Sequence, residues 1–138
     1  LEEVNKVLLI SGGLGETMKE VEKYRPKRVD YIELDPCLTK AALETGIIKE
    51  SRTLNVINTD GRYYLKTGKG PYDAIIVTAA AASLPQDLCD QLKEGGRLII
   101  PVGNEQQSLL CIDRIEGELK TSTIESVRFV PLVAGELM

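Results

Sequence analysis

The stretch that decides the fold is KVLLISGGLG, residues 6–15. It begins with an apolar run, residues 6–10, and continues directly into the small residues 11–13. Three apolar residues then recur at the i, i+4 and i+7 spacing of one helical face: Leu14, Met18 and Val21. Pro26 marks the end of this helical pattern. The stretch therefore predicts a strand, a tight glycine turn and a helix, the opening unit of an α/β fold.

Beyond this unit, short apolar runs and helical patterns alternate along the chain. Strands are predicted at residues 29–34, 54–58 and 72–78, and the last of these is the most apolar. Asp35-Pro36 is a typical helix start, with Asp at the N-cap and Pro at the first helical position. A further helix is predicted at about residues 84–93, where leucines recur every four residues. This alternation predicts an α/β, doubly wound, mostly parallel sheet with the strand order 3-2-1-4-5.

The final third of the chain departs from the alternation. Only five residues, 103–107, separate a predicted strand at 97–102 from another at 108–115. A crossover to a parallel strand needs a dozen or more residues, so these two strands are expected to form an antiparallel hairpin. Glu116-Gly117 is a second tight turn before a seventh strand at about residues 123–130. We therefore expect the sheet to finish with antiparallel strands 6 and 7.

Length and composition restrict the possible functions. The 138 residues suffice for one domain, and the 43% hydrophobic and 28% charged residues are typical of a globular protein. We expect a single domain over residues 1–138. The chain contains no histidine. This excludes a Ser-His-Asp triad, an HExxH zinc site and a histidine general base, and we expect no metal site.

Charge and aromatic content argue against nucleic acid as a partner. The net charge is −4; residues 1–69 carry 12 basic and 11 acidic groups, whereas residues 70–138 carry 5 and 10. Neither half is the basic footprint that nucleic acid requires. The chain has only five Tyr, one Phe and no Trp, so it offers few side chains on which bases stack.

Cysteine use and hydropathy favour a cytoplasmic protein. The three cysteines, Cys37, Cys89 and Cys111, are widely spaced and include no CxxC pair, which is typical of reduced thiols. No apolar run reaches the roughly 18 residues that a membrane span needs, and no signal peptide pattern begins the sequence. We therefore expect no membrane partner.

The glycine cluster is a candidate ligand site. Glycines between a strand and a helix let a ligand approach the backbone and the first amides of the helix, although any tight turn of this kind also favours glycine. A dinucleotide fingerprint counted from Ser11 needs a small residue at position 16, where this chain has Glu16. The negative charge of the Glu16 carboxylate repels a pyrophosphate. S-adenosylmethionine carries a sulfonium and an ammonium group and no phosphate, so the cluster is compatible with that cofactor.

Acidic residues at two further strand ends fit the same ligand. Glu33 lies 20 residues after Gly13, the spacing at which a carboxylate meets ribose hydroxyls, although it also flanks the next predicted helix. Asp60-Gly61 ends the third strand, where a carboxylate accepts the adenine amino group or simply forms a turn. Ligands of such sheets bind outside the carboxyl ends of the strands. The three strand ends together predict one nucleoside crevice.

Two stretches of the chain resemble known families. Residues 6–77 resemble the core of spermidine synthases in four segments: KVLLISGGLGETMKEV, VDYIELDP, INTDGRYYL and YDAIIV. Residues 71–138 resemble the carboxyl-terminal half of bacterial protein-L-isoaspartate O-methyltransferases in two: PYDAIIVTAAAASLPQDLCDQLKEGGRLIIPVG and VRFVPLVAGEL. Both families share the Rossmann-like fold of methyltransferases that use S-adenosylmethionine, so the resemblance implies that fold and that cofactor. The mosaic also raises the alternative of a recombined or engineered chimera.

The resemblance also implies a set of cofactor-binding residues. These are Ser11, Gly13 and Gly15 in the loop, Glu33 at the ribose, and Asp60 and Gly61 at the adenine. Ser11 departs from both families, which usually have glycine there, and it narrows the space for the methionine portion of the cofactor.

The segment after the fourth strand bears on the reaction. Spermidine synthases place carboxylates there to bind and deprotonate the amine, whereas this chain has Thr78 followed by four alanines. Aminopropyl transfer is therefore disfavoured. The same segment matches the isoaspartyl methyltransferase loop, which implies that Thr78, Ala79 and Ala80 lie on the substrate side. The alternatives are a β-branched strand end for Thr78 and close helix packing for the alanines.

The resemblance implies a limited activity. The isoaspartyl methyltransferases build much of their substrate pocket from a segment before the first strand, and here only five residues precede Lys6. We expect an S-adenosylmethionine-binding methyltransferase-type domain, with a peptide or protein carboxylate as acceptor and slow or absent turnover. The alternatives are a non-enzymatic chimeric scaffold and an aminopropyltransferase relative of spermidine synthase.

Overall fold

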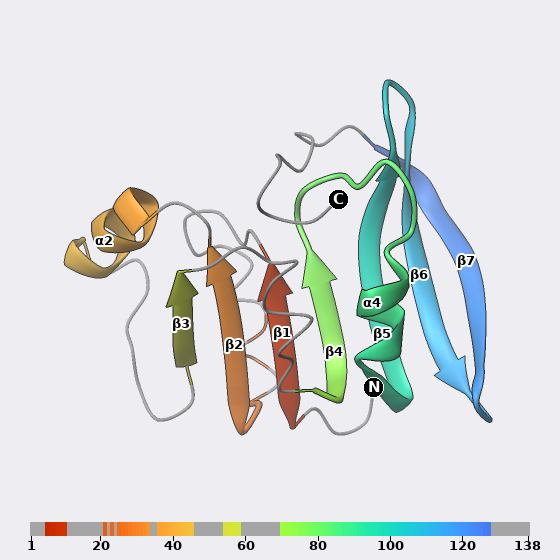
Figure 1. Ribbon diagram of the computed structural model, residues 1–138, viewed down its shortest axis with the longest axis horizontal. Helices are drawn as coiled ribbons and strands as arrows, with labels where there is room; N and C mark the ends of the chain where they lie inside the picture. Colours follow the sequence, from red (N-terminus) through yellow and green to blue (C-terminus); the bar gives the residue numbers. More distant parts are fainter. Residues whose placement is uncertain are drawn as a thin grey trace.

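The computed structural model describes residues 5–10, 21, 23, 25–33, 36–45, 54–58 and 70–127. Within these residues, seven strands form one sheet in the order β3-β2-β1-β4-β5-β6-β7 (Figure 1). The strands are β1 (Lys6–Ile10), β2 (Arg28–Glu33), β3 (Leu54–Asn58), β4 (Tyr72–Val77), β5 (Leu92–Gly103), β6 (Gln107–Ile115) and β7 (Glu118–Val127). The described helices are α2 (Pro36–Glu44) and α4 (Gln86–Asp90).

The first five strands form the parallel part of the sheet. Strand β1 lies between β2 and β4 and pairs in parallel with both, while β3 and β5 extend the sheet on either side. Helix α2 contacts β2 and β3, and α4 packs against β5 (Figure 1). This arrangement confirms the predicted α/β fold class and the strand order 3-2-1-4-5.

The last two strands are antiparallel, as predicted. Strands β5 and β6 pair from Arg97↔Asp113 to Gly103↔Gln107, so a short turn joins them. The backbone of Gly103 has a φ of 134°, and a Cβ atom there would collide with the carbonyl oxygen of Gln106. Only glycine is therefore accommodated where this hairpin begins its turn.

The core follows rows of residues that run across the strands. One row consists of side chains that are each 0% exposed: Asp30, Leu8, Ile75, Leu98 and Ile112. Four members are aliphatic and belong to the larger hydrophobic cluster, which includes Leu88 and Cys89 of α4. The row shows that a single apolar layer continues from the parallel part of the sheet into the antiparallel part. Its one charged member, Asp30, lies at the β2 end.

The predicted helix at residues 84–93 is shorter in the structure. Helix α4 spans only Gln86–Asp90, and Pro85 at its N-cap is extended. A residue that precedes proline is disfavoured in helical conformation, so Leu84 stays outside the helix. The helix ends early because the Gln91 carbonyl accepts a hydrogen bond from the Tyr72 amide at 2.7 Å. Leu92 then pairs with Tyr72, so β5 begins five residues before the predicted strand at 97–102.

The seventh strand also begins earlier than predicted. It spans Glu118–Val127 rather than residues 123–130, and residues 128–130 lie outside the described residues. Glu116 and Gly117 have φ values of 53° and 77°, which is the conformation of a two-residue hairpin turn. Because this turn closes directly, pairing starts at Ile115↔Glu118. The polar residues that follow Glu118 are tolerated because several are exposed at the sheet edge.

None of the three cysteines forms a disulfide bond. Cys89 and Cys111 are buried, whereas Cys37 is exposed on α2. Burial raises the pKa of the Cys89 thiol, which keeps it in its unreactive protonated form. In the part of the chain that the structure describes, no helix is long and apolar enough to cross a membrane.

Candidate functional site

The candidate site lies at the carboxyl edge of the parallel strands. Ile32 of β2 and Val77 of β4 both align with Ile10, the last residue of β1. The next residues along these strands, Glu33 and Thr78, therefore flank the end of β1. Two strand spacings separate them, or about 10 Å between backbones. The register thus brings together two predicted site residues that are 45 positions apart in sequence.

Glu33 is a buried carboxylate at this edge. It is the last residue of β2, pairs with Asn58 of β3, and is only 6% exposed. A buried carboxylate is costly unless polar groups or a ligand satisfy it. Its negative charge also acts on the next residue of the same strand face, Tyr31. Burial, and then the charge of Glu33, raises the pKa of Tyr31 to about 12.

The Tyr31 hydroxyl should therefore lose its proton at a higher pH than an ordinary tyrosine does. The folded protein holds its pKa above the ordinary value of 10, so folding favours the neutral phenol. This contribution to stability is complete below about pH 10 and is lost as the pH rises through about 12. An alkaline titration followed by phenolate absorbance should show a step near pH 12 that is missing in the Tyr31→Phe variant. A Tyr31→Phe variant with the same late step would contradict the assignment.

Thr78 is tied to the end of β1. Its amide donates a hydrogen bond to the Ile10 carbonyl at 3.1 Å, and its Oγ1 lies 3.4 Å from the same oxygen. Thr78 is only half-buried. The hydrogen bonds thus hold a partly accessible hydroxyl beside the position where the predicted glycine turn begins.

The alanines after Thr78 are packed against β5. The Ala81 amide donates to the Pro101 carbonyl at 3.0 Å, and the Gly103 amide donates to the Ala81 carbonyl at 2.8 Å. Ala79 and Ala80 are both buried. The alternative expected from the sequence was close helix packing, whereas the hydrogen bonds of Ala81 are to residues of β5. A substrate-side role of Ala79 and Ala80 stays a prediction, and Thr78 is more accessible than either of them.

Five predicted cofactor residues lie outside the described residues: Ser11, Gly13, Gly15, Asp60 and Gly61. Their roles stay predictions. Among the described residues, no group of three or more acidic or cysteine side chains has the arrangement of a metal site.

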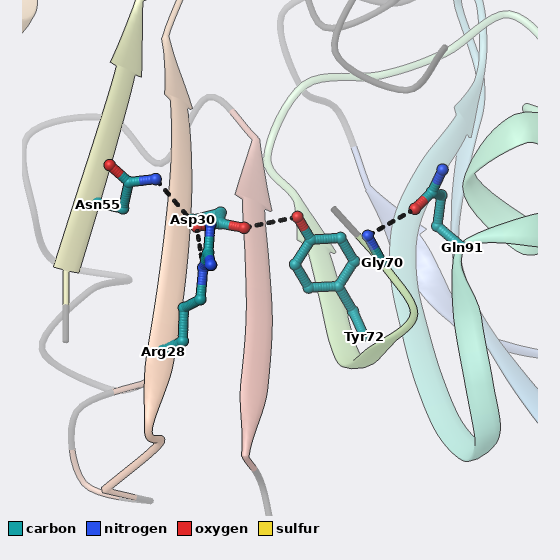
Figure 2. Close-up of polar contacts among 6 residues, drawn as sticks. All are labelled: Arg28, Asp30, Asn55, Gly70, Tyr72 and Gln91. Carbon is teal, nitrogen blue, oxygen red and sulfur yellow. Dashed lines mark hydrogen bonds and ion pairs between the residues drawn. The ribbon is translucent and has the colours of Figure 1, made fainter. Parts of the chain in front are cut away.

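A polar cluster on β2 was missed by the sequence reasoning. Asp30 accepts hydrogen bonds from Arg28, Asn55 and Tyr72 in the interior of the sheet. The available signal was Asp30, a charged residue flanked by apolar and aromatic residues in the first part of the strand, VDYI. Figure 2 shows this cluster together with a separate hydrogen bond from Gly70 to Gln91.

The comparison with protein families covers almost the whole chain. The model of the family described as "Protein-L-isoaspartate(D-aspartate) O-methyltransferase (PCMT)" matches residues 1–137. This one match includes both the stretch that resembles spermidine synthases and the stretch that resembles isoaspartyl methyltransferases. The comparisons therefore do not confirm a chimera.

The chain is similar to curated relatives over part of their length. A protein-L-isoaspartate O-methyltransferase of Vibrio campbellii is 54% identical over 91 residues, which are 65% of this chain and 44% of the relative. The chain thus spans less than half the length of that relative.

Solved structures show the same fold. A structure from Plasmodium falciparum, described as a protein-L-isoaspartate O-methyltransferase in complex with S-adenosyl-L-homocysteine, has a TM-score of 0.74 and 24% identity. That match covers 94% of this chain and 66% of that one. The spermidine synthase of Thermotoga maritima has a TM-score of 0.62 and 27% identity over 72% of this chain and 37% of the other. The spermidine synthase resemblance thus has a structural counterpart.

Proposed function

We infer that this chain, which belongs to the protein-L-isoaspartate(D-aspartate) O-methyltransferase family, binds S-adenosylmethionine at the carboxyl edge of its parallel strands. The observation that carries the proposal is Glu33. It is a buried carboxylate at the end of β2, placed beside the end of β1 by the strand register. This is where a doubly wound sheet presents an acceptor to ribose hydroxyls.

The described residues fit this cofactor. The Glu33 carboxylate can accept hydrogen bonds from two hydroxyl groups, and the hydrogen bonds of Thr78 hold the end of β4 against the end of β1. We propose that the remaining contacts come from Ser11, Gly13 and Gly15 in the loop, and from Asp60 and Gly61 near the adenine. The similar protein from Plasmodium falciparum forms a complex with S-adenosyl-L-homocysteine, the demethylated cofactor, which supports the same choice here.

The reaction that we propose for this site is methyl transfer to the carboxylate of an isoaspartyl residue. When bound, S-adenosylmethionine supplies an electrophilic methyl group. A carboxylate acceptor is already ionised and nucleophilic, so the absence of histidine from the chain is no obstacle. The contribution of the protein is alignment, which contributes about 7–11 kcal/mol to lowering such barriers. We propose that Thr78 lines the acceptor side, because its half-buried hydroxyl lies beside the end of β1.

Cofactor binding is tested by calorimetry with S-adenosylmethionine, S-adenosylhomocysteine and NAD. We expect both sulfur nucleosides to bind and NAD to bind far more weakly, because Glu16 opposes a pyrophosphate. Failure of both sulfur nucleosides to bind at millimolar concentration would overturn the proposal and favour an inert scaffold.

Methyl transfer is tested separately with labelled S-adenosylmethionine and an isoaspartyl peptide, with the matching aspartyl peptide as control. Label in the isoaspartyl peptide alone would support the proposed reaction. Label in neither peptide, from a chain that binds S-adenosylmethionine, would overturn the proposed reaction. Decarboxylated S-adenosylmethionine with putrescine should give no product, because no carboxylate follows β4 in Thr78–Ala82.

A further inference from the structure

Asp30 is the one charged member of the fully buried row that crosses the sheet. Its Oδ1 accepts hydrogen bonds from Arg28 Nε at 2.8 Å and from Asn55 Nδ2 at 3.3 Å. Its Oδ2 accepts one from the Tyr72 hydroxyl at 2.6 Å. A buried carboxylate is tolerated when donors and an opposite charge surround it. Removal of one donor is then costly, because the carboxylate stays buried.

The Tyr72 contact differs from the other two because it bridges strands that are not neighbours. Asp30 lies on β2 and Tyr72 on β4, with β1 between them. Figure 2 shows the Tyr72 ring pointing from β4 toward Asp30, with the hydrogen bond passing over β1. The Lys6 ammonium of β1 lies 5.0 Å from the centre of the same ring. The ring and the hydrogen bond thus link β2 to β4 across the central strand.

The strands joined by this hydrogen bond are the two that carry the described site residues. Glu33 follows Asp30 by three residues on β2, about 10 Å along the strand. Thr78 follows the last residue of β4, the strand that Tyr72 begins. The backbone pairing of β1 sets the register of each strand. The side-chain link restrains how β2 and β4 sit relative to one another.

We propose that the Asp30–Tyr72 hydrogen bond is a positioning device for the cofactor crevice, keeping Glu33 and Thr78 at a fixed separation on either side of β1. This rests on the proposed function, since Glu33 and Thr78 belong to the proposed binding site. Asp30 and Tyr72 touch no reacting atom and act through β2 and β4. Arg28 balances the charge of Asp30, and Asn55 extends the same cluster to β3.

The first test is Tyr72→Phe, which removes the hydroxyl and keeps the ring. We expect the dissociation constant for S-adenosylhomocysteine to rise about three- to tenfold. The matched control is Ile112→Val, which loosens the same buried row at β6, away from the crevice. At temperatures where both variants are fully folded, the control should bind like the wild type. Equal affinity of Tyr72→Phe and wild type would overturn the proposal.

A second variant separates positioning from stability. Asp30→Leu combined with Tyr72→Phe removes both partners, so no carboxylate is left buried without its donor. Such apolar replacement of both partners is often nearly neutral for stability. We expect its stability to recover above that of Tyr72→Phe while its affinity stays low. Recovery of affinity together with stability would show that the hydrogen bond is merely structural.

A third measurement does not need the ligand. The Thr78 amide donates to Ile10 at the carboxyl edge, so its hydrogen exchange reports the local order of the crevice. We expect exchange at Thr78 to accelerate in Tyr72→Phe and not in Ile112→Val. Failure of the wild type to bind S-adenosylhomocysteine would refute the proposed function. Unchanged exchange at Thr78 would refute the positioning role alone.

Discussion

Replacement of Ile75 by alanine is expected to lower the free energy of unfolding by about 2–5 kcal/mol. Ile75 is 0% exposed in the central strand β4, where it aligns with Leu8 of β1 and Leu98 of β5. Both neighbours are held in paired strands. The surrounding structure therefore has little freedom to fill the cavity, and the lost contacts add to the lost burial of the side chain.

The matched control is Ile124→Ala, at an isoleucine that is 52% exposed on β7. Surface substitutions of this kind usually change stability by less than about 0.5 kcal/mol. Urea unfolding of the wild type and both variants measures the difference through the midpoint and slope of each transition. A loss at Ile75 no greater than the loss at Ile124 would mean that β4 is not central to the core.

Replacement of Glu33 by alanine is expected to weaken the binding of S-adenosylhomocysteine by ~1–3 kcal/mol, a factor of about 5–150 in the dissociation constant. The physical reason is that ribose hydroxyls enclosed in the crevice lose their acceptor. Glu33 itself is buried, so water does not readily replace the carboxylate. Calorimetry with the folded variant gives the dissociation constant directly.

Two further variants make this measurement specific. Glu118→Ala removes an exposed carboxylate on β7, far along the sheet from β2, and should leave the affinity unchanged. Glu33→Gln keeps an acceptor oxygen without the charge and should bind more tightly than Glu33→Ala. Unchanged affinity in Glu33→Ala would remove Glu33 from the cofactor site.

Local sequence patterns were sufficient to identify the seven strands and the order in which they pair, although not every strand end. The apolar run at Lys6–Ile10 and the strand Leu54–Asn58 were predicted with their observed bounds. The antiparallel pairing of the fifth and sixth strands followed from the length of the connection between them, since five residues are too few for a crossover to a parallel strand. These features depend on neighbouring residues, whose spacing and turn chemistry are visible in the chain.

The ends of α4 and β7 could not be obtained in this way. Leucines at helical spacing favoured a helix to residue 93, but Leu92 pairs with Tyr72, a residue 20 positions earlier. The residues after Gly117 are polar, so the sequence did not indicate that β7 begins there. In the structure, the pairing of Glu118 with Ile115 sets the start of β7. At the end of α4 and at the start of β7, hydrogen bonds to a partner strand determined the backbone conformation. Local sequence patterns do not predict such a partner strand.

For the candidate site, too, some features could be predicted from the sequence and others depend on the folded sheet. The sequence alone indicated Glu33 and Thr78 as residues at strand ends, because the sequence itself shows where an apolar run ends. Their placement on opposite sides of Ile10, and the link from Asp30 to Tyr72 across β1, exist only in the folded sheet. Parallel pairing joins residues distant in the chain, so the register and the buried partner of a charge are properties of the tertiary structure.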